Sequence, residues 1–108
     1  VVDRLRRVEW GRGAARDLDA IAEWIAKESP QGAAGLVRDA LAAAESLSSL
    51  ASRGRIVPEM RNDSIRELLV SSYRLIYSVS DSAVFIVALL HQRQDFARWQ
   101  QGSGRSTP

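Results

Sequence analysis

The residues whose types can carry chemistry fall in the second half of the chain, within a series of short apolar segments typical of strands. Glu59 lies in the first of these segments, Arg74 in a later one, and His91 at the end of the last. An arginine on a sheet can bind a phosphate or a partner's carboxylate through its planar fork of donors. Histidine titrates near neutrality and can serve as an acid or a base. Adjacent strands would bring these side chains together on one concave surface.

The same region also has a purely structural interpretation. Arg66 and Arg74 can pair with Glu59 or Glu67 as cross-strand ion pairs, which contribute little energy at a surface. A lone histidine at the end of a strand is more often a hydrogen-bonded structural residue than a catalytic one. The residue types by themselves favour the ion pairs, and contact between Glu59 and Arg74 decides between the two interpretations.

Metal and cofactor sites are not expected. The chain has no cysteine and one histidine, so the carboxylates of Asp17, Asp19 and Glu23 lack the partners that a transition-metal site usually requires. The glycines do not have the spacing of a phosphate-binding loop or of a dinucleotide fingerprint, and no nucleophile-elbow sequence occurs. We therefore predict that the protein uses no metal and no cofactor.

The composition indicates a small globular protein. Its 108 residues fit a single domain, which we place at residues 1–101, followed by a disordered tail at 102–108. No apolar run is long enough to span a membrane, and the N-terminus lacks the layout of a secretory signal, which points to the cytoplasm. Of the 15 basic residues, Lys27 is the only lysine. Arginine suits a nucleic-acid or acidic partner, but a GC-rich genome produces the same bias.

The elements that must position the polar residues begin with a helical half. Apolar residues at helical spacing predict one helix over about 14–27 and a second over about 30–50, after a first strand at 5–10. Ser29 is suited to cap the second helix, because the proline that follows it favours the first helical position. Gly54 is suited to the left-handed conformation that often ends a helical segment.

The second half changes to the pattern of strands. Strands are predicted at Ile56–Met60, Ile65–Val70, Tyr73–Val79 and Ala83–Leu90, with a last short helix at Gln94–Gln100. Alternation places Tyr73, Leu75 and Tyr77 on one face of their strand, and Arg74 and Ile76 on the other. The predicted fold class is therefore α+β, in which an antiparallel twisted sheet packs against an N-terminal two-helix hairpin.

Three blocks of the strand half occur in a recognisable order: GRIVPE at 54–59, IREL at 65–68 and YRLIY at 73–77. They are preceded by ARDLDAI at 15–21 and followed by His91-Gln92-Arg93. This ordered set covers about residues 8–95 and resembles the RelE/ParE superfamily of toxins from type II toxin–antitoxin systems. The blocks are most similar to ParE-like members.

The resemblance implies one of two targets. ParE-like members poison DNA gyrase with no chemistry of their own, whereas RelE-like members cut messenger RNA on the ribosome without a metal. We expect a growth-inhibiting toxin that acts on gyrase by binding. Its target-facing basic surface is assigned to Arg66, Arg74 and Arg93. A toxin-like protein that has lost its activity is a third interpretation.

The ribonuclease alternative assigns roles to the polar residues by their position in the family's order. One ribonuclease subgroup uses a glutamate base, an arginine on the phosphate and a histidine acid, which would be Glu59, Arg74 and His91. That subgroup follows its histidine with a C-terminal tyrosine, where this chain has Gln92. RelE-like members also carry a cluster of lysines and arginines, and this chain has one lysine. Both departures favour the gyrase interpretation.

The resemblance also implies a partner that silences the toxin. It would be a ParD-like antitoxin whose acidic C-terminal segment wraps the toxin in a hetero-oligomer. Trp24 departs from the apolar stripe of its helix, so an exposed Trp24 would be a natural anchor for a bound partner. We predict that an amphipathic segment of the antitoxin lies along the helical hairpin near Trp24 and Leu36, with a strand on a sheet edge as a second mode of contact, and that its acidic residues meet the arginines.

Overall fold

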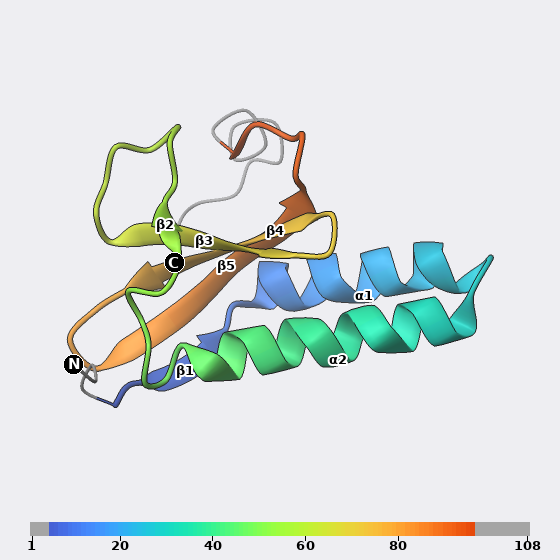
Figure 1. Cartoon of the computed structure of the whole chain (residues 1–108), viewed down its shortest axis with the longest axis horizontal. Helices are drawn as coiled ribbons and strands as arrows, with labels where there is room; N and C mark the ends of the chain where they lie inside the picture. The colour runs from blue at the N-terminus through green and yellow to red at the C-terminus, as the bar shows by residue number, and fades with distance from the viewer. Residues whose placement is uncertain (1–4, 97–108) are drawn as a thin grey trace.

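The structure, a computed structural model, describes residues 5–96. A hairpin of two helices, α1 (Arg12–Ala26) and α2 (Pro30–Ser46), lies along one face of a five-stranded sheet (Figure 1). The strands are β1 (Arg7–Trp10), β2 (Arg55–Ile56), β3 (Ile65–Val70), β4 (Tyr73–Val79) and β5 (Ala83–His91). The predicted α+β class, with the helical hairpin on one face of the sheet, is confirmed.

The helical hairpin forms where small and apolar residues recur at helical spacing, so that each helix has one side suited to burial. The buried positions of the two helices are Ala14, Leu18, Ala33, Leu36, Ala40 and Ala44. The second helix begins at the predicted cap, because the Ser29 hydroxyl accepts the Gly32 N–H at 2.9 Å. This bond satisfies one of the backbone donors that a helix start leaves free. No described helix has the length and apolar character needed to cross a bilayer.

The strands lie in the order β1-β5-β4-β3-β2. The last three strands of the chain form an antiparallel meander, as predicted, and the bounds of β3 and β4 are those expected from the sequence. Val70 pairs with Tyr73 across a tight turn. Ser71 in that turn has a φ of 56°, a left-handed conformation that close hairpins require.

The sheet is mixed, although the sequence predicts an antiparallel one throughout. β1 pairs with β5 in parallel, with Arg7 opposite Ala83 and Trp10 opposite Ile86. Parallel neighbours need a long connection between them, and here the connection includes both helices and three strands. Alternation within one short strand does not reveal the direction of a partner so far along the chain.

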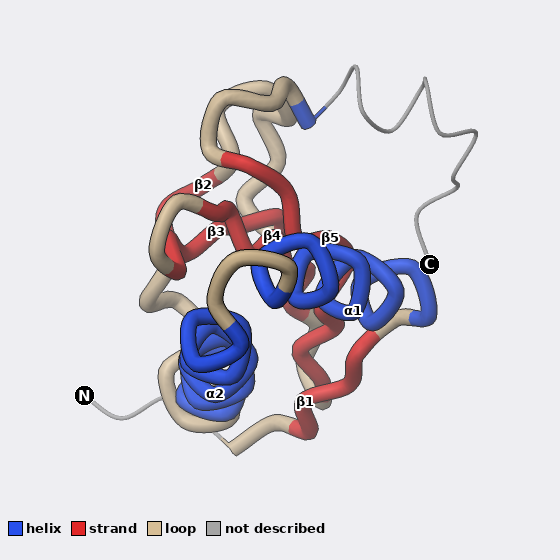
Figure 2. The backbone as a smooth tube through the Cα atoms, turned by 90° about the vertical axis from the view of Figure 1, so that its right-hand side faces the viewer, coloured by secondary structure: helices blue, strands red, loops and turns tan. Residues whose placement is uncertain are grey.

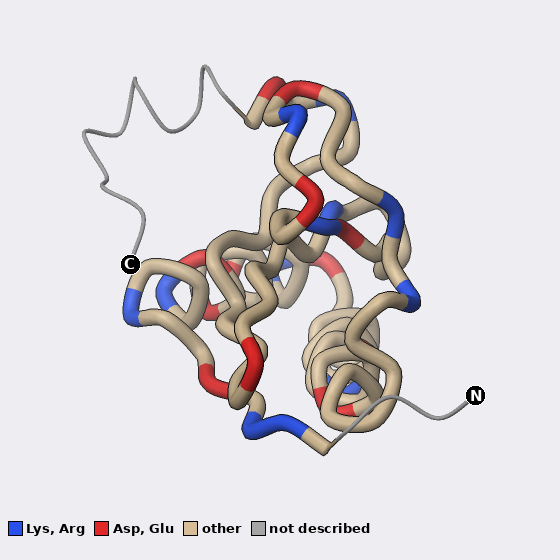
Figure 3. Tube along the Cα trace, turned by 90° about the vertical axis from the view of Figure 1, so that its left-hand side faces the viewer, with Lys and Arg blue, Asp and Glu red and all other residues tan. Residues whose placement is uncertain are grey.

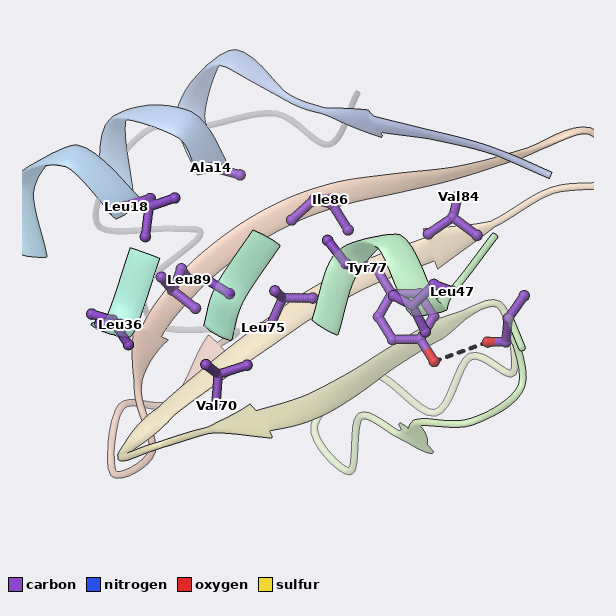
Figure 4. Packing of buried hydrophobic residues seen from close by; sticks show 13 residues of the cluster. Ala14, Leu18, Leu36, Leu47, Val70, Leu75, Tyr77, Val84, Ile86 and Leu89 are labelled. Carbon is purple, nitrogen blue, oxygen red and sulfur yellow. Dashed lines mark hydrogen bonds between the residues drawn. The ribbon is translucent and has the colours of Figure 1, made fainter. Parts of the chain in front are cut away.

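The main hydrophobic core lies between the hairpin and the sheet (Figure 4). The side chains of β4 that face it are Leu75 and Tyr77, both fully buried, and Tyr73 and Val79 pack at its border. Figure 2 shows the two helices end-on beside the strands that they cover. The predicted alternation of β4 is therefore confirmed on this face.

A second, smaller apolar cluster covers the opposite face of the sheet. Its buried members are Val57, Ile65, Ile76, Val87, Ala88, Leu90 and Phe96. The loop at 57–64 and the segment at 92–96 lie on this side, away from the helices (Figures 1 and 2). A register shift between β4 and β5 at Ile76 and Tyr77 lets the neighbouring Val87 and Ala88 both face this cluster.

Three predicted boundaries differ from the structure. The strand expected at 56–60 is only Arg55–Ile56, because the chain turns immediately afterwards, with the Met60 N–H donating to the Val57 carbonyl. α2 ends at Ser46 rather than near residue 50, so Gly54 does not cap it. The helix expected at 94–100 extends beyond the described residues, and the tail expected at 102–108 lies outside them.

Candidate functional site

Arg74 lies at the centre of a buried polar cluster on the face of the sheet that points away from the helices. Its Nε donates to Glu67 at 2.6 Å, and its two terminal nitrogens donate to the two carboxylate oxygens of Glu59 at 2.8 and 2.9 Å. One terminal nitrogen also donates to the Gln94 carbonyl at 2.6 Å. Arg74 is 5% exposed and Glu67 is 3% exposed. The Arg74 guanidinium therefore donates its hydrogen bonds to acceptors within its own chain.

The cluster connects segments that lie far apart in the sequence. Glu59, in the loop after β2, also accepts the backbone N–H of Phe96 at 3.0 Å. Glu67 of β3 accepts a second guanidinium, that of Arg55, on its other oxygen. Through these bonds the loop at 57–64 and the segment at 92–96 are held together over the second apolar cluster.

The contacts of the cluster fix the charge of its members. The Arg74 guanidinium lowers the pKa of Glu59 from 4.5 to about 2, against the opposing effect of burial and with help from the Phe96 N–H. Burial disfavours the charged form of Arg74, but its hydrogen bonds to Glu59 and Glu67 outweigh burial, so its pKa is raised. A carboxylate that holds its negative charge down to about pH 2 is a weak base, since an efficient general base has a pKa near the working pH.

His91 lies on the other side of the sheet. It pairs with Tyr73 in the register of β4 and β5, whereas Arg74 pairs with Leu90. Successive residues of a strand point to opposite faces, so His91 and Arg74 do too. The His91 ring meets the Tyr73 ring edge to face at 5.8 Å, and its Nδ1 accepts the Arg93 N–H at 3.2 Å. The expected convergence of Glu59, Arg74 and His91 on one surface is therefore wrong.

The three arginines predicted to face the target do not form one surface. Arg66 lies opposite Tyr77, on the helix side of the sheet, and donates to the Gly54 carbonyl at 2.8 Å. Arg93 is exposed in the turn after β5. Arg74 is buried on the far face. Figure 3 shows Lys and Arg positions scattered over the molecule with acidic positions between them.

The two residues predicted to bind the antitoxin have opposite environments. Trp24 is 69% exposed, and the Lys27 ammonium stands 5.3 Å from its ring centre, within the range of a cation–π contact. A hollow of about 320 Å³ lies beside it, lined also by Ile25 and Tyr73. Leu36 is 6% exposed and belongs to the main core. The prediction of free apolar surface at Leu36 is therefore wrong.

Comparison with known proteins decides the family. A family model described as the ParE toxin of the type II toxin–antitoxin system parDE matches residues 8–96. The chain belongs to the ParE toxin family. A solved structure titled "Chromosomal ParDE TA system from P. aeruginosa" has a similar fold, with a TM-score of 0.66 and 23% sequence identity over 81% of this chain and 96% of that one. No curated protein matches the chain.

Membership in the ParE family gives a physical meaning to the blocks that carried the resemblance. Each of the three blocks supplies one residue of the buried cluster: Glu59 from the first, Glu67 from the second and Arg74 from the third. The blocks are therefore connected by charge and hydrogen bonding across the far face of the sheet. They specify how this ParE chain folds.

Two polar features of this ParE chain were not predicted, one on each face of the sheet. The hydroxyl of Tyr77 accepts the Gly54 N–H at 2.8 Å and donates to the Ala51 carbonyl at 2.9 Å, as the dashed line in Figure 4 marks for the second bond. The backbone of 94–96 closes the Arg74 cluster. The partners in both cases are backbone groups, and the types of the side chains do not predict where backbone groups will lie. Across residues 5–96 no three His, Cys, Asp or Glu residues are grouped so that they could hold a metal.

Proposed function

We propose that the protein is a toxin that inhibits growth by binding and poisoning DNA gyrase, without catalysis, and that a cognate antitoxin neutralises it. Membership in the ParE toxin family supports the first part. The similar fold of a protein whose title names a ParDE toxin–antitoxin system supports an antitoxin partner.

One observation carries the choice of binding over catalysis. The arginine and glutamate that a ribonuclease would use are engaged with each other, and the histidine lies on the opposite face of the sheet. An arginine whose donors are occupied by Glu59, Glu67 and Gln94 has to break a buried ion pair before it can hold a phosphate. Breaking such a pair is costly, because it leaves an unpaired buried charge.

His91→Ala is the cleanest test of this proposal. The variant removes the only histidine but leaves the Arg74 cluster intact, so we expect cells that express it to stop growing as they do with the original protein. Purified His91→Ala protein is expected to inhibit DNA supercoiling by gyrase as the unchanged protein does. Loss of growth inhibition in a variant that unfolds at the same urea concentration as the original would support the ribonuclease function instead.

Glu59→Gln is the companion variant. It keeps the shape of the side chain but removes the charge that pairs with Arg74. A gyrase toxin is expected to lose potency only in proportion to its lost stability, which urea unfolding measures. A ribonuclease is expected to lose all activity even in the folded fraction, because its general base would be gone.

The antitoxin is proposed to anchor on the exposed Trp24, beside the hollow that Ile25 and Tyr73 line. Aromatic side chains in such hollows often dominate binding energy. Trp24→Ser is therefore expected to weaken neutralisation by the co-expressed antitoxin by more than about tenfold, whereas Leu50→Ser, at another exposed apolar residue, is expected to leave it unchanged. Hydrogen exchange that shows no protection of the α1–α2 hairpin in the complex would rule out this placement.

A further inference from the structure

The two edges of the sheet carry different side chains, and they differ in how well they are protected from pairing with a further strand. A free strand edge offers unpaired backbone donors and acceptors, and proteins commonly block it with charged side chains. The outer strand β1 follows this rule, because Arg7 and Glu9 stand exposed on it and pair with each other at 3.5 Å. On the other edge, the part of β3 that β2 does not cover exposes an apolar residue, Leu69, 64% of which is open to solvent.

The edge at Leu69 is open because β2 is cut short. In the antiparallel register Arg55 pairs with Glu67 and Ile56 with Arg66, so Arg53 would have to pair with Leu69 if β2 continued backwards. The chain instead turns to the helix side at Gly54, whose N–H is held by the Tyr77 hydroxyl at 2.8 Å.

Gly54 permits this turn because, without a side chain, its backbone can lie close to Glu67 and Tyr77. A Cβ at Gly54 would lie 2.5 Å from both the Glu67 carbonyl oxygen and the Tyr77 hydroxyl. Glycine is therefore needed where the chain leaves the sheet. The departure of the chain from β3 is built into the fold by Gly54 and Tyr77.

The backbone of Leu69 points to this open edge. In an antiparallel ladder, alternate residues direct both backbone groups to the same side. The Ile65 carbonyl accepts the Val57 N–H on the β2 side, which places the backbone groups of Glu67 and Leu69 on that side as well. β2 covers Glu67, and it ends before Leu69. A hollow of about 340 Å³ lies here, lined by Arg53, Gly54, Arg55, Glu67, Leu68 and Leu69.

The charge around the hollow is positive. The side chain of Arg55 is 70% exposed although it contacts Glu67, whose other oxygen already serves Arg74. Within residues 5–96, Arg53 and Arg66 have no carboxylate partner, and their hydrogen bonds go to the Ser46 hydroxyl and to backbone carbonyls. An occupant of this edge therefore gains by carrying carboxylates beside an extended backbone.

We propose that the β3 edge at Leu69 binds a short extended acidic segment of the antitoxin by strand addition. Backbone bonds to Leu69 give the segment its direction, the Leu69 side chain gives it apolar contact, and its carboxylates meet Arg53 and Arg55. The identity of the occupant rests on the proposed function. This surface is separate from the Trp24 hollow, which lies at the α1–α2 turn.

The test uses the full chain labelled with ¹⁵N and a capped peptide of alternating glutamate and valine, with a lysine–valine peptide of the same length as the control. We expect the glutamate peptide to shift the Leu69 amide resonance and to slow its hydrogen exchange about tenfold at saturation. The amides of Arg7 and Glu9, on the other edge, should not change. The lysine peptide should not bind.

Two variants separate the backbone from the charge. Leu69→Pro removes the edge-facing N–H without removing a bond of the β3–β4 ladder, and it should abolish binding. Arg53→Glu keeps that N–H and should weaken binding about threefold, so the proposal stays testable if Leu69→Pro does not fold. Leu50→Ser is the matched control at another exposed leucine and should bind normally.

Three outcomes would overturn the proposal: shifts that map only to the Trp24 hollow, equal binding of the lysine peptide, and unchanged binding by both edge variants. Inhibition of purified gyrase by the unchanged protein is measured in parallel. Normal gyrase inhibition with no peptide binding would refute the edge proposal and leave the gyrase function standing. Peptide binding without any gyrase inhibition would refute the gyrase function and leave the edge proposal standing.

Discussion

The two faces of the sheet are held by different forces. The face under the helices is covered by apolar side chains such as Leu75 and Tyr77, and the Tyr77 hydroxyl bonds to backbone groups there. Within residues 5–96, the far face is covered by a loop and a short segment held by the Glu59–Arg74–Glu67 cluster. Burial of apolar area is tolerant of small changes in geometry, whereas a buried ion pair depends on both partners.

The same residue types fit both a phosphate-cleaving site and a buried ion-pair cluster, and their contacts distinguish the two. A covering loop without secondary structure of its own needs specific bonds to hold it, and Glu59 of this loop supplies them by accepting two hydrogen bonds from Arg74. The residue types are those of a phosphate-cleaving site. The bonding holds a loop in place, because Glu59 and Arg74 form an ion pair, and the proposed binding function is supported by that pair.

The largest effect is expected from Arg74→Ala. It leaves the Glu59 and Glu67 carboxylates without their central cation, and Glu67 is 3% exposed. We expect the free energy of unfolding in urea to fall by about 3–5 kcal/mol. The exposed Arg93→Ala should change it by less than about 0.5 kcal/mol. A loss below about 1 kcal/mol for Arg74→Ala would mean that the cluster does not hold the far face.

Lowering the pH should destabilise the far face of the sheet before the helix-covered face. The pKa of Glu59 is about 2 in the folded protein, below its ordinary value of 4.5. Its contribution to stability is therefore fully present above about pH 5 and is lost as the pH falls toward 2, up to about 3 kcal/mol in total. Hydrogen exchange should show the Phe96 amide opening in this range before the Leu75 amide.

Glu59→Gln supplies the control for the acid experiment. It should lower stability at neutral pH and flatten the dependence on pH between 4.5 and 2. An equally steep acid transition in this variant would assign the effect to other carboxyl groups. Simultaneous opening of both faces would contradict the separate roles of the core and the cluster.

Tyr77→Phe tests a buried polar anchor of the helix-covered face. The change leaves the Gly54 N–H and the Ala51 carbonyl without the partner that the hydroxyl provides. Unpaired buried polar groups cost about 1–3 kcal/mol, which urea unfolding would measure. Leu75→Met, a change of similar volume at the same face, should cost less than about 1.5 kcal/mol. A larger loss for Leu75→Met would reverse the expected order.

The smallest effect is expected away from both faces, at the start of α2. Ser29→Ala removes the hydroxyl that accepts the Gly32 N–H. We expect a loss of about 1 kcal/mol, which a shift of the urea midpoint would report, with no change in the acid transition of the far face. Ser29→Asp keeps an acceptor at the cap and should retain the stability of the unchanged chain.

Much of the fold was predictable because it depends on local patterns. The helical spacing of apolar residues predicted both helices, and Ser29 predicted the start of α2. Alternation along the strand assigned Leu75 and Arg74 to opposite faces of the sheet. The parallel pairing of β1 with β5 was not predictable, because it depends on a partner more than seventy residues away along the chain. The start of β2 at Arg55 depends on Tyr77, whose hydroxyl holds Gly54 from a different strand, and its end at Ile56 depends on the turn that the Met60 N–H closes onto the Val57 carbonyl.

The candidate site was predictable in its members but not in its geometry. The sequence identified Glu59, Arg74 and Glu67 as a possible ion-pair set, and these residues do meet. It did not reveal that His91 is one residue out of step with Arg74 in the register of β4 and β5. A single step along a strand moves a side chain to the other face, and residue types contain no record of register.

Pulse labelling of cells just after induction of the protein tests the central claim most directly. Incorporation of thymidine and of methionine is followed separately over the first minutes. A toxin that binds gyrase should stop thymidine incorporation first while methionine incorporation continues. If methionine incorporation stops first, the protein acts on translation, and the Glu59–Arg74 pair would have to open during catalysis.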